Sequence, residues 1–305
     1  MTTTAQTGWS RLYVLLFCCA ALSPAPADAK VFLLTQGGGG LYDTVTQGIG
    51  KRLGDRVEVA NIEKLSTPEE LAAVLRAKQP EVLIVVGVDS ARLASKAELK
   101  LPIVFCLLPQ AERESLGGLN STGVVLEVPL GAQLAALKTI LPAVKKLGVL
   151  YNPKVSRGLI GQARTAASKA GLTLVEQQVA GANEIAEALD SIAGNIDAVW
   201  MLQDRTVGTA LAFKVLLIGT LESKLPLISY SGSFVEGGAL LSLAPDFEKT
   251  AELTVDLAKK VMGGASPRSL PWEDGPGEVV LNLKAASRLG ISIAPAAMNG
   301  ARTVR

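Results

Sequence analysis

The stretch VLIVVGVDSARLASKAELKLPIVF, residues 82–105, decides the fold, because AVWMLQDRTVGTALAFKVLLIGTLESKLPLISY, residues 198–230, repeats its order of elements. Both stretches run from a short apolar segment through an acidic residue and a helical segment to a Leu-Pro pair and a second apolar segment. Asp204 and Pro226 stand in the second stretch where Asp89 and Pro102 stand in the first. Doubly wound folds share this rhythm, so coincidence is the alternative; we interpret the pair as two halves of similar architecture.

Short apolar runs alternate with amphipathic helical segments along the chain. Such alternation is typical of a parallel sheet covered by helices on both faces. The sequence therefore predicts an α/β fold of two doubly wound parallel-sheet lobes, with a hinge and a cleft between them. The predicted strands are Val31–Thr35, Val57–Ala60, Val82–Val86, Ile103–Leu107, Leu147–Leu150, Leu172–Val175, Ala198–Leu202 and Leu227–Ser229, and predicted helices include Pro68–Lys78, Gln162–Ala170 and Glu184–Ile192.

The domain boundaries follow from this repeat and from a change of pattern after Ser242. A long helix at residues 247–262 is expected to return to the first lobe, and a connector rich in Pro and Gly follows it. We predict a first lobe of residues 30–142 plus 245–265 and a second lobe of residues 143–244 plus 277–293. Residues 294–305 are predicted to form a flexible tail.

Residues 1–29 have the three parts of a secretory signal peptide: Arg11, the apolar run Leu12–Leu22 and the small-x-small sequence Ala27-Asp28-Ala29. A membrane anchor is disfavoured because the run is shorter than the about 20 residues that span a bilayer. Lipidation at Cys18 or Cys19 is disfavoured because neither follows a small residue. We therefore predict cleavage after residue 29 and a periplasmic location.

Composition excludes several classes of function. The chain has 30 basic and 28 acidic residues, a balance that argues against nucleic acid and anionic membranes as partners. It has no histidine, which excludes His-based catalytic triads and His metal ligands. Cys106 lies in the apolar run LPIVFCLLP, where a buried structural thiol is favoured over a reactive one. We predict no catalytic residue, no metal and no cofactor.

Four glycines, Gly37–Gly40, follow the first predicted strand and precede a helical segment. Neither nucleotide-binding glycine motif fits, because Leu41 and Tyr42 occur where a phosphate loop has Lys and Ser or Thr, and the dinucleotide pattern fails at its third glycine. Backbone amides of Gly38, Gly39 and Gly40, with the positive end of the helix, are predicted to bind an anionic group of a small ligand. A plain strand-to-helix turn is the alternative.

Further candidates follow the other strands, because ligands of open α/β sheets bind at the carboxyl ends of the strands. Asp89 and Asp204 each offer a carboxylate for a ligand ammonium or a cap for the next helix; capping is favoured for Asp89, and the two roles are balanced for Asp204. Aromatic side chains would form the apolar walls. The predicted binding residues are Gly38, Gly39, Gly40, Tyr42, Gly87, Asp89, Tyr151, Asn152, Asp204, Thr206, Tyr230 and Ser231.

The segments KKLGVLYNPKVS, QARTAASKAGLTLVE, VWMLQDRTVGTAL, LPLISYSGSFVEGGALLSLAPDFEKTAELTVDLAKKVMGGASPRSLP and LNLKAASRLGI carry a resemblance to a known family. In order and spacing they resemble the ABC-transporter substrate-binding proteins of the type I two-lobed class. Within it they are most similar to the branch that includes tryptophan- and tyrosine-binding receptors. The resemblance covers roughly residues 120–292, and residues 30–119 match loosely.

The resemblance implies a receptor that closes over one small solute and delivers it to an ABC permease driven by a cytoplasmic ATPase. It places ligand contacts at Tyr151-Asn152, Asp204-Arg205-Thr206 and Ser229–Ser233, with Asp204 binding the amine of an amino-acid ligand. We therefore expect a monomeric, non-enzymatic binding protein for an amino-acid-like solute or a small organic anion. A sensory component that feeds a kinase or chemoreceptor is the alternative, and a periplasmic enzyme is a weaker one.

Overall fold

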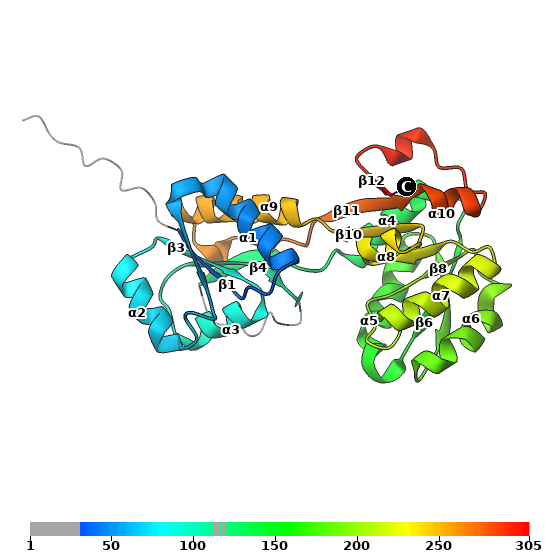
Figure 1. Ribbon diagram of the computed structural model, residues 1–305, viewed down its shortest axis with the longest axis horizontal. Coiled ribbons are helices and arrows are strands. Elements are labelled where there is room, and N and C mark those ends of the chain that lie inside the picture. The colour runs from blue at the N-terminus through cyan, green and yellow to red at the C-terminus, as the bar shows by residue number, and fades with distance from the viewer. Residues whose placement is uncertain (1–30, 111, 113–115, 117–119, 305) are drawn as a thin grey trace, which may run out of the picture.

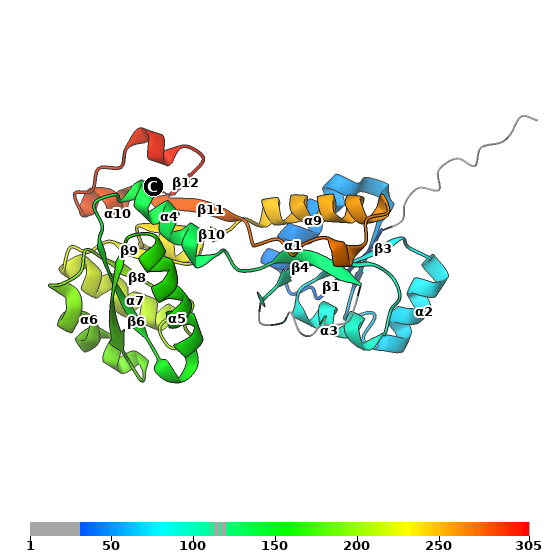
Figure 2. The ribbon, with the colours of Figure 1, turned by 180° about the vertical axis from the view of Figure 1, so that it is seen from behind.

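The computed structural model describes residues 31–110, 112, 116 and 120–304. The chain forms two lobes at opposite ends of an elongated molecule, joined by extended segments (Figure 1). One lobe holds a sheet of order β2-β1-β3-β4-β5, and the other holds a sheet of order β12-β11-β10-β9-β8-β6-β7. Helices cover the sheets, as the view from behind in Figure 2 also shows. The predicted fold class, two α/β lobes built on parallel sheets, is confirmed.

The first lobe has an entirely parallel sheet. Its central strands are runs of Val, Ile and Leu without alternation, because helices bury both of their faces. Its elements are β1 Val31–Thr35, α1 Leu41–Leu53, β2 Val57–Asn61, α2 Pro68–Lys78, β3 Val82–Val86, α3 Val88–Lys96, β4 Ile103–Leu108, β5 Ser121–Val125 and, later in the chain, α9 Phe247–Met262.

The second lobe is parallel except where β10 pairs antiparallel with β11. Two core clusters, one on each face of its sheet, hold it together. Its elements are α4 Leu130–Ile140, β6 Lys146–Tyr151, α5 Pro153–Lys169, β7 Thr173–Gln178, α6 Ile185–Ala193, β8 Ala198–Trp200, α7 Ala210–Glu222, β9 Leu227–Ser229, α8 Gly232–Glu236, β10 Leu241–Pro245, β11 Gly277–Asn282, α10 Leu283–Arg288 and β12 Arg302–Val304.

Helix α4 belongs to the second lobe, which differs from the predicted boundary after residue 142. Its buried residues Leu134, Leu137 and Ile140 share a core cluster with Trp200. The sheet of the second lobe needs this helix because an apolar strand face must be covered. The chain therefore passes from the first lobe to the second between β5 and α4.

The C-terminal residues also differ from the predicted flexible tail. Strand β12 pairs with β11, with Arg302 opposite Val280. The guanidinium of Arg302 forms ion pairs with Glu236 at 2.9 Å and Glu278 at 3.1 Å. Strand pairing and this charge pair attach the end of the chain to the sheet of the second lobe.

Helix α9 leaves the second lobe after β10 and packs in the first lobe. Its residues Ala251, Val255 and Ala258 are buried in one core cluster with Ile49 of α1. The two helices approach closely at Gly48, where an added Cβ would lie 2.8 Å from the Cβ of Ala251. The first lobe is therefore built from two separate parts of the chain.

Three segments connect the lobes and hydrogen-bond to one another; we call them the hinge. They are the last residue of β5 with the chain after it (residues 125–129), the last residue of β10 with the turn to α9 (residues 245–246) and the chain that leads into the first residue of β11 (residues 273–277). The amide of Val125 donates to the carbonyl oxygen of Glu273 at 3.0 Å, and that of Gly275 donates to Glu127 at 3.1 Å. The amide of Asp246 donates to Pro276 at 2.9 Å. The three segments that join the lobes are thus held together by backbone hydrogen bonds.

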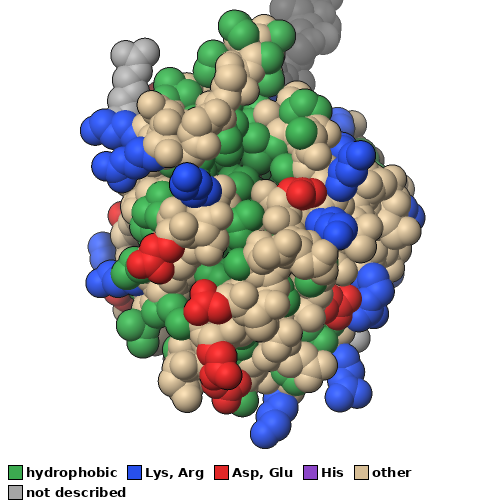
Figure 3. Space-filling model, turned by 90° about the vertical axis from the view of Figure 1, so that its right-hand side faces the viewer, with side chains coloured by type: hydrophobic (Ala, Val, Ile, Leu, Met, Phe, Trp, Pro, Cys, Tyr) green, Lys and Arg blue, Asp and Glu red, His purple; other side chains and the backbone are tan. Residues whose placement is uncertain are grey.

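The surface mixes both signs of charge. On the end of the second lobe, acidic and basic side chains are spread between apolar patches (Figure 3). The predicted signal peptide, residues 1–29, lies outside the described residues. Within the part that the structure describes, no helix combines the length and the apolar character that crossing a bilayer requires.

Candidate ligand-binding cleft

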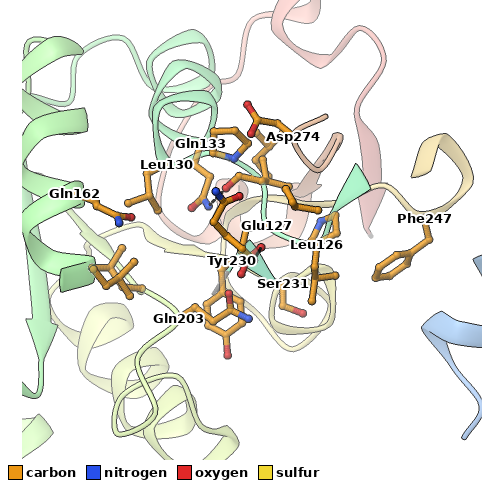
Figure 4. A pocket seen from close by; sticks show the side chains of 18 of the residues that line it. Leu126, Glu127, Leu130, Gln133, Gln162, Gln203, Tyr230, Ser231, Phe247 and Asp274 are labelled. Atoms are coloured by element: carbon orange, nitrogen blue, oxygen red, sulfur yellow. Dashed lines mark hydrogen bonds between the residues drawn. The ribbon is translucent and has the colours of Figure 1, made fainter. Parts of the chain in front are cut away.

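A cleft of about 900 Å³ opens where the hinge meets the two lobes (Figure 4). Its volume falls within the range of small-molecule sites, about 300–1,000 Å³. Most of its lining comes from the hinge and the second lobe, and three residues come from the first lobe. The lining residues are Leu41, Gln110, Val125, Leu126, Glu127, Val128, Pro129, Leu130, Gln133, Leu159, Gln162, Leu202, Gln203, Tyr230, Ser231, Leu243, Pro245, Phe247 and Asp274.

The cleft has apolar walls and a small number of polar groups. Leucines, Tyr230 and Phe247 form the walls, and four glutamines offer amide donors and acceptors between them. Glu127 and Asp274 carry the charges of the cleft; among the described residues that line it there is no Lys or Arg. Figure 4 places Glu127 in the midst of the cluster and Asp274 at its edge. The lining therefore suits a ligand with an apolar body and a cationic or neutral polar group.

Glu127 is fixed by the hinge. It follows β5 by two residues, and its Oε2 accepts a hydrogen bond from the amide of Gln110 at 2.9 Å. Its backbone passes directly against Gly275, where an added Cβ would lie 2.6 Å from the Glu127 carbonyl oxygen. A glycine is required at this position because two hinge segments touch there.

Tyr230 and Ser231 are the predicted binding residues that line this cleft. The hydroxyl of Tyr230 donates to the carbonyl oxygen of Gly208 at 2.6 Å, and its ring packs edge-on against Phe234. Burial raises the pKa of Tyr230. The hydroxyl of Ser231 lies 2.8 Å from that of Ser233. Both residues follow β9, so the carboxyl end of this strand does reach the cleft.

The carboxylate of Asp204, the predicted partner of a ligand ammonium group, accepts hydrogen bonds from several protein donors. Oδ1 accepts from the amides of Thr206 at 2.6 Å and Val207 at 3.1 Å, and Oδ2 accepts from the amide of Asn152 at 2.9 Å. The side chain of Ser156 supplies a fourth hydrogen bond. The residue is 2% exposed and does not line the cleft. The carboxylate therefore orders the loop after β8.

The pKa of Asp204 reflects this network. Burial would raise it, but the hydrogen bonds from the Ser156 side chain and from three backbone amides outweigh burial and lower the pKa below its ordinary value. The same network includes Asn152, whose Nδ2 donates to the Thr206 hydroxyl at 3.0 Å. Thr206 and Asn152 thus support the loop rather than line the cleft.

Tyr151 is in the core rather than in the wall of the cleft. It ends β6, is 6% exposed and packs in the cluster that contains Trp200. Its hydroxyl accepts a hydrogen bond from Gln178 at 3.3 Å. Asn152 caps α5 by accepting from the amide of Lys154 at 2.9 Å.

The glycine run lies at the edge of the first lobe. All four residues have left-handed φ, between 59° and 92°, and Gly40 precedes the first turn of α1. Within the described residues, no hydrogen bond is recorded from the amides of Gly38, Gly39 or Gly40. The run does not line the cleft in this arrangement of the lobes, but Leu41, directly after it, does.

Gly87 and Asp89 lie beside the glycine run and outside the cleft lining. Gly87, with φ of 89°, is the residue that precedes α3, and an added Cβ would lie 2.9 Å from Cε1 of Tyr42. The amide of Asp89 donates to Oε1 of Gln36 at 3.0 Å. The carboxylate of Asp89 is 62% exposed, lies 3.9 Å from Arg92 and does not cap the helix. The prediction that the carboxylate of Asp89 caps α3 is therefore wrong.

Sequence reasoning missed most of the cleft. Glu127, Gln133, Gln162 and Asp274 were not among the predicted binding residues. One signal could have found Glu127: the residues after β5 lie at the carboxyl edge of the sheet, where ligand-binding residues are expected. Because Ser121–Val125 lacks the apolar pattern of the predicted strands, the sequence does not predict a binding residue after it.

Comparison with known proteins shows the family and the relatives to which this chain is similar. The family described as ABC transporter substrate binding protein matches residues 36–304. A tyrosine-binding protein of Clostridioides difficile (strain R20291) is 24% identical over 234 residues, covering 73% of this chain and 67% of that protein. A Streptococcus pneumoniae ABC domain solved in complex with L-Trp is 26% identical, covers 90% of this chain and 99% of its own, and has a TM-score of 0.58.

A further solved structure has the same fold. It is the ligand-free, open structure of a substrate binding protein with adhesive properties from Clostridium difficile, 22% identical, with a TM-score of 0.77 and coverage of 91% of this chain and 99% of that one. The family match covers nearly all of the described chain, from the glycine run to β12. The protein belongs to the family of ABC transporter substrate-binding proteins.

Proposed function

We propose that this protein is an extracytoplasmic receptor that binds an amino-acid-like solute in the cleft at the hinge and delivers it to an ABC permease with its ATPase. The observation that carries the proposal is the cleft itself, which is apolar, has a few fixed polar groups and lies between two lobes of a chain of this family. The protein acts as a monomer, without catalysis or cofactor, in the periplasm.

Binding is coupled to closure of the lobes. A solute that enters the cleft first contacts the hinge and the second lobe, because these supply most of the lining. Closure brings the glycine run of the first lobe toward the solute, where the unbonded amides of Gly38, Gly39 and Gly40 would bind its anionic group, with Tyr42 beside them. A ligand that binds the closed form more tightly shifts the population toward that form.

Aromatic amino acids are the first ligands to test. The relatives include a tyrosine-binding protein and a protein solved with L-Trp, and the walls here offer leucines, Tyr230 and Phe247 for a ring to contact. A small organic anion fits less well, because Glu127 and Asp274 are the charged residues of the described lining.

The experiment uses the chain from Lys30 onward, purified under native conditions, and measures its thermal unfolding with each of the 20 amino acids. L-tyrosine or L-tryptophan at 100 times its Kd adds about 2.7 kcal/mol to the free energy of unfolding. Titration calorimetry of the stabilising compound then gives the Kd. A screen in which no amino acid stabilises the protein overturns the proposed ligand class.

Delivery is tested in cells. Deletion of the gene should abolish high-affinity uptake of the radiolabelled ligand, and restoring the gene should recover it. If uptake is unchanged while a cellular response to the ligand is lost, the protein serves a sensory system instead.

A further inference from the structure

The cleft carries two carboxylates without a basic side chain to balance them. Glu127 and Asp274 line it, and no Lys or Arg does so among the described residues. Carboxylates beside apolar walls are costly unless a cation or hydrogen-bond donors compensate them. The pair does not form a metal site, because no group of three or more His, Cys, Asp and Glu side chains capable of holding an ion occurs in the described part of the chain.

One carboxylate oxygen of Glu127 accepts a hydrogen bond from the protein, and the other can accept one from a ligand. Oε2 accepts from the amide of Gln110 at 2.9 Å, which fixes the direction of the side chain. For Oε1 no hydrogen bond from the described residues is recorded. Glu127 is half-buried, and apolar residues Leu126, Val128 and Leu130 line the same cleft. An ion pair that a ligand forms there becomes stronger as the lobes close over it, because water then screens it less.

Asp204 is less suited to this function than Glu127, because it is buried outside the cleft lining and four protein donors hydrogen-bond to its carboxylate. Asp274 lies at the edge of the cleft and is more exposed than Glu127. Glu127 is therefore the carboxylate whose position and free oxygen suit direct contact with a ligand.

We infer that Glu127 binds the ammonium group of the solute, and that this contact selects ligands that carry an amine. The inference rests on the proposed function. It places the contact with the ammonium group of the ligand in the hinge instead of in the second lobe. Because the backbone of Glu127 is bonded to Gly275, a ligand held by its side chain lies at the point about which the lobes move. Affinity for the amine and closure of the lobes are thereby linked.

The test compares three compounds with one side chain: L-tryptophan, tryptamine, which lacks the carboxylate, and indole-3-propionate, which lacks the amine. Calorimetry on the wild-type chain from Lys30 should show binding of L-tryptophan and tryptamine and a loss of at least about tenfold for indole-3-propionate. The matching tyrosine series, L-tyrosine, tyramine and 3-(4-hydroxyphenyl)propionate, is measured in parallel.

The decisive variant is Glu127→Gln, because its amide oxygen still accepts from Gln110 and the hinge keeps its geometry. It should bind L-tryptophan or L-tyrosine at least about tenfold more weakly and lose the preference for amines, with an unchanged melting temperature in the absence of ligand. Asp274→Asn should weaken binding by no more than about threefold. Glu187→Gln, on the exposed face of α6, is the matched control and should have no effect.

The outcomes separate this inference from the function on which it rests. If the wild-type protein binds the amino acid and Glu127→Gln binds it equally well, or if the deaminated acid binds as well as the amino acid, the inference is wrong and the proposed function stands. If no compound of either series binds the wild-type protein, the inference is wrong for aromatic amino acids, and the proposed function fails as well if none of the 20 amino acids stabilises the protein.

Discussion

Asp89 in the first lobe and Asp204 in the second follow equivalent buried strands, yet their carboxylates have opposite surroundings. Asp89 is in the first turn of α3, exposed to solvent and 3.9 Å from Arg92. Asp204 is buried and accepts hydrogen bonds from three backbone amides. The same residue type at matching positions of the repeat is a surface charge in one lobe and a structural element in the other.

The length of the connection accounts for the difference. In the first lobe β3 ends at Val86 and α3 begins at Val88, so Gly87 alone makes the turn. In the second lobe β8 ends at Trp200 and α7 begins only at Ala210. Residues 201–209 carry backbone amides that need acceptors in a buried place, and Asp204 supplies them. The longer loop therefore gives Asp204 a structural role that Asp89 does not have.

The largest effect is expected when the two aspartates are each replaced by alanine. Asp204→Ala should lower the free energy of unfolding by about 3 kcal/mol, because buried amide donors lose their acceptor. Asp89→Ala should change it by less than about 0.5 kcal/mol, since exposed ion pairs contribute little. Urea unfolding followed by tryptophan fluorescence measures both, because Trp200 lies in the second core and Trp272 packs against Phe105 in the first lobe. Equal losses for the two variants would contradict the comparison.

The contribution of the Asp204 carboxylate to stability should also depend on pH. Hydrogen bonds lower the pKa of Asp204, so its carboxylate stabilises the folded state above the ordinary pKa and loses this effect as the pH falls through the lowered value. Asp204→Asn should therefore be less stable than wild type at pH 7 by about 2 kcal/mol, and the gap should narrow below about pH 4. Urea midpoints of the Trp200 signal between pH 7 and pH 3 measure it. A gap that is constant over this range would exclude the charged carboxylate as the cause.

Gly87→Ala should destabilise the first lobe by about 2 kcal/mol, because a left-handed conformation is strained for alanine. The residue has φ of 89°, and its new Cβ would lie 2.3 Å from Oε1 of Gln36. The loss should appear in the Trp272 signal and not in that of Trp200. Gly50→Ala is the control: this position lies within α1 with no atom within 4 Å of the added Cβ. It should stabilise the first lobe by about 0.5–1 kcal/mol.

The smallest change is expected in the labelling of the Cys106 thiol in the Asp204→Ala variant. This thiol reports opening of the first lobe. Burial raises the pKa of its thiol to about 12, although a hydrogen bond with Thr254 acts in the opposite direction. At pH 8 a disulfide reagent should therefore label the folded chain from Lys30 only through opening of the lobe. Asp204→Ala should leave the labelling rate within about twofold of wild type, and Gly87→Ala should raise it by about tenfold or more. Acceleration by both variants would show that the lobes open together.

Much of the fold could be predicted from apolar runs alone. Val31–Thr35, Val82–Val86 and Leu227–Ser229 are strands with the predicted bounds, because buried parallel strands are continuous in Val, Ile and Leu. The presence of two lobes of similar architecture could be predicted from the sequence repeat. These two predictions rest on local sequence patterns, so neither requires knowledge of contacts between distant parts of the chain.

Strand β5 was missed because its first three residues are Ser121, Thr122 and Gly123. The Thr122 hydroxyl donates to the carbonyl oxygen of Pro271 at 3.0 Å, and a Cβ at Gly123 would lie 2.2 Å from the carbonyl oxygen of Phe105. These contacts are tertiary, so no local pattern predicts them. The cleft depends on the same strand, since Glu127 follows it, and the site was therefore harder to predict than the fold.

The packing of α9 in the first lobe limits how early this lobe can fold while the chain is being synthesised. Ala251, Val255 and Ala258 belong to the core beneath β1, β3 and β4. When the chain is made from its N-terminus, α1 covers only part of one face of that early sheet, and the rest of this face stays uncovered until residues 247–262 have followed. A fragment cut off after β5 should therefore aggregate, and both lobes acquire their native cores only near the end of synthesis.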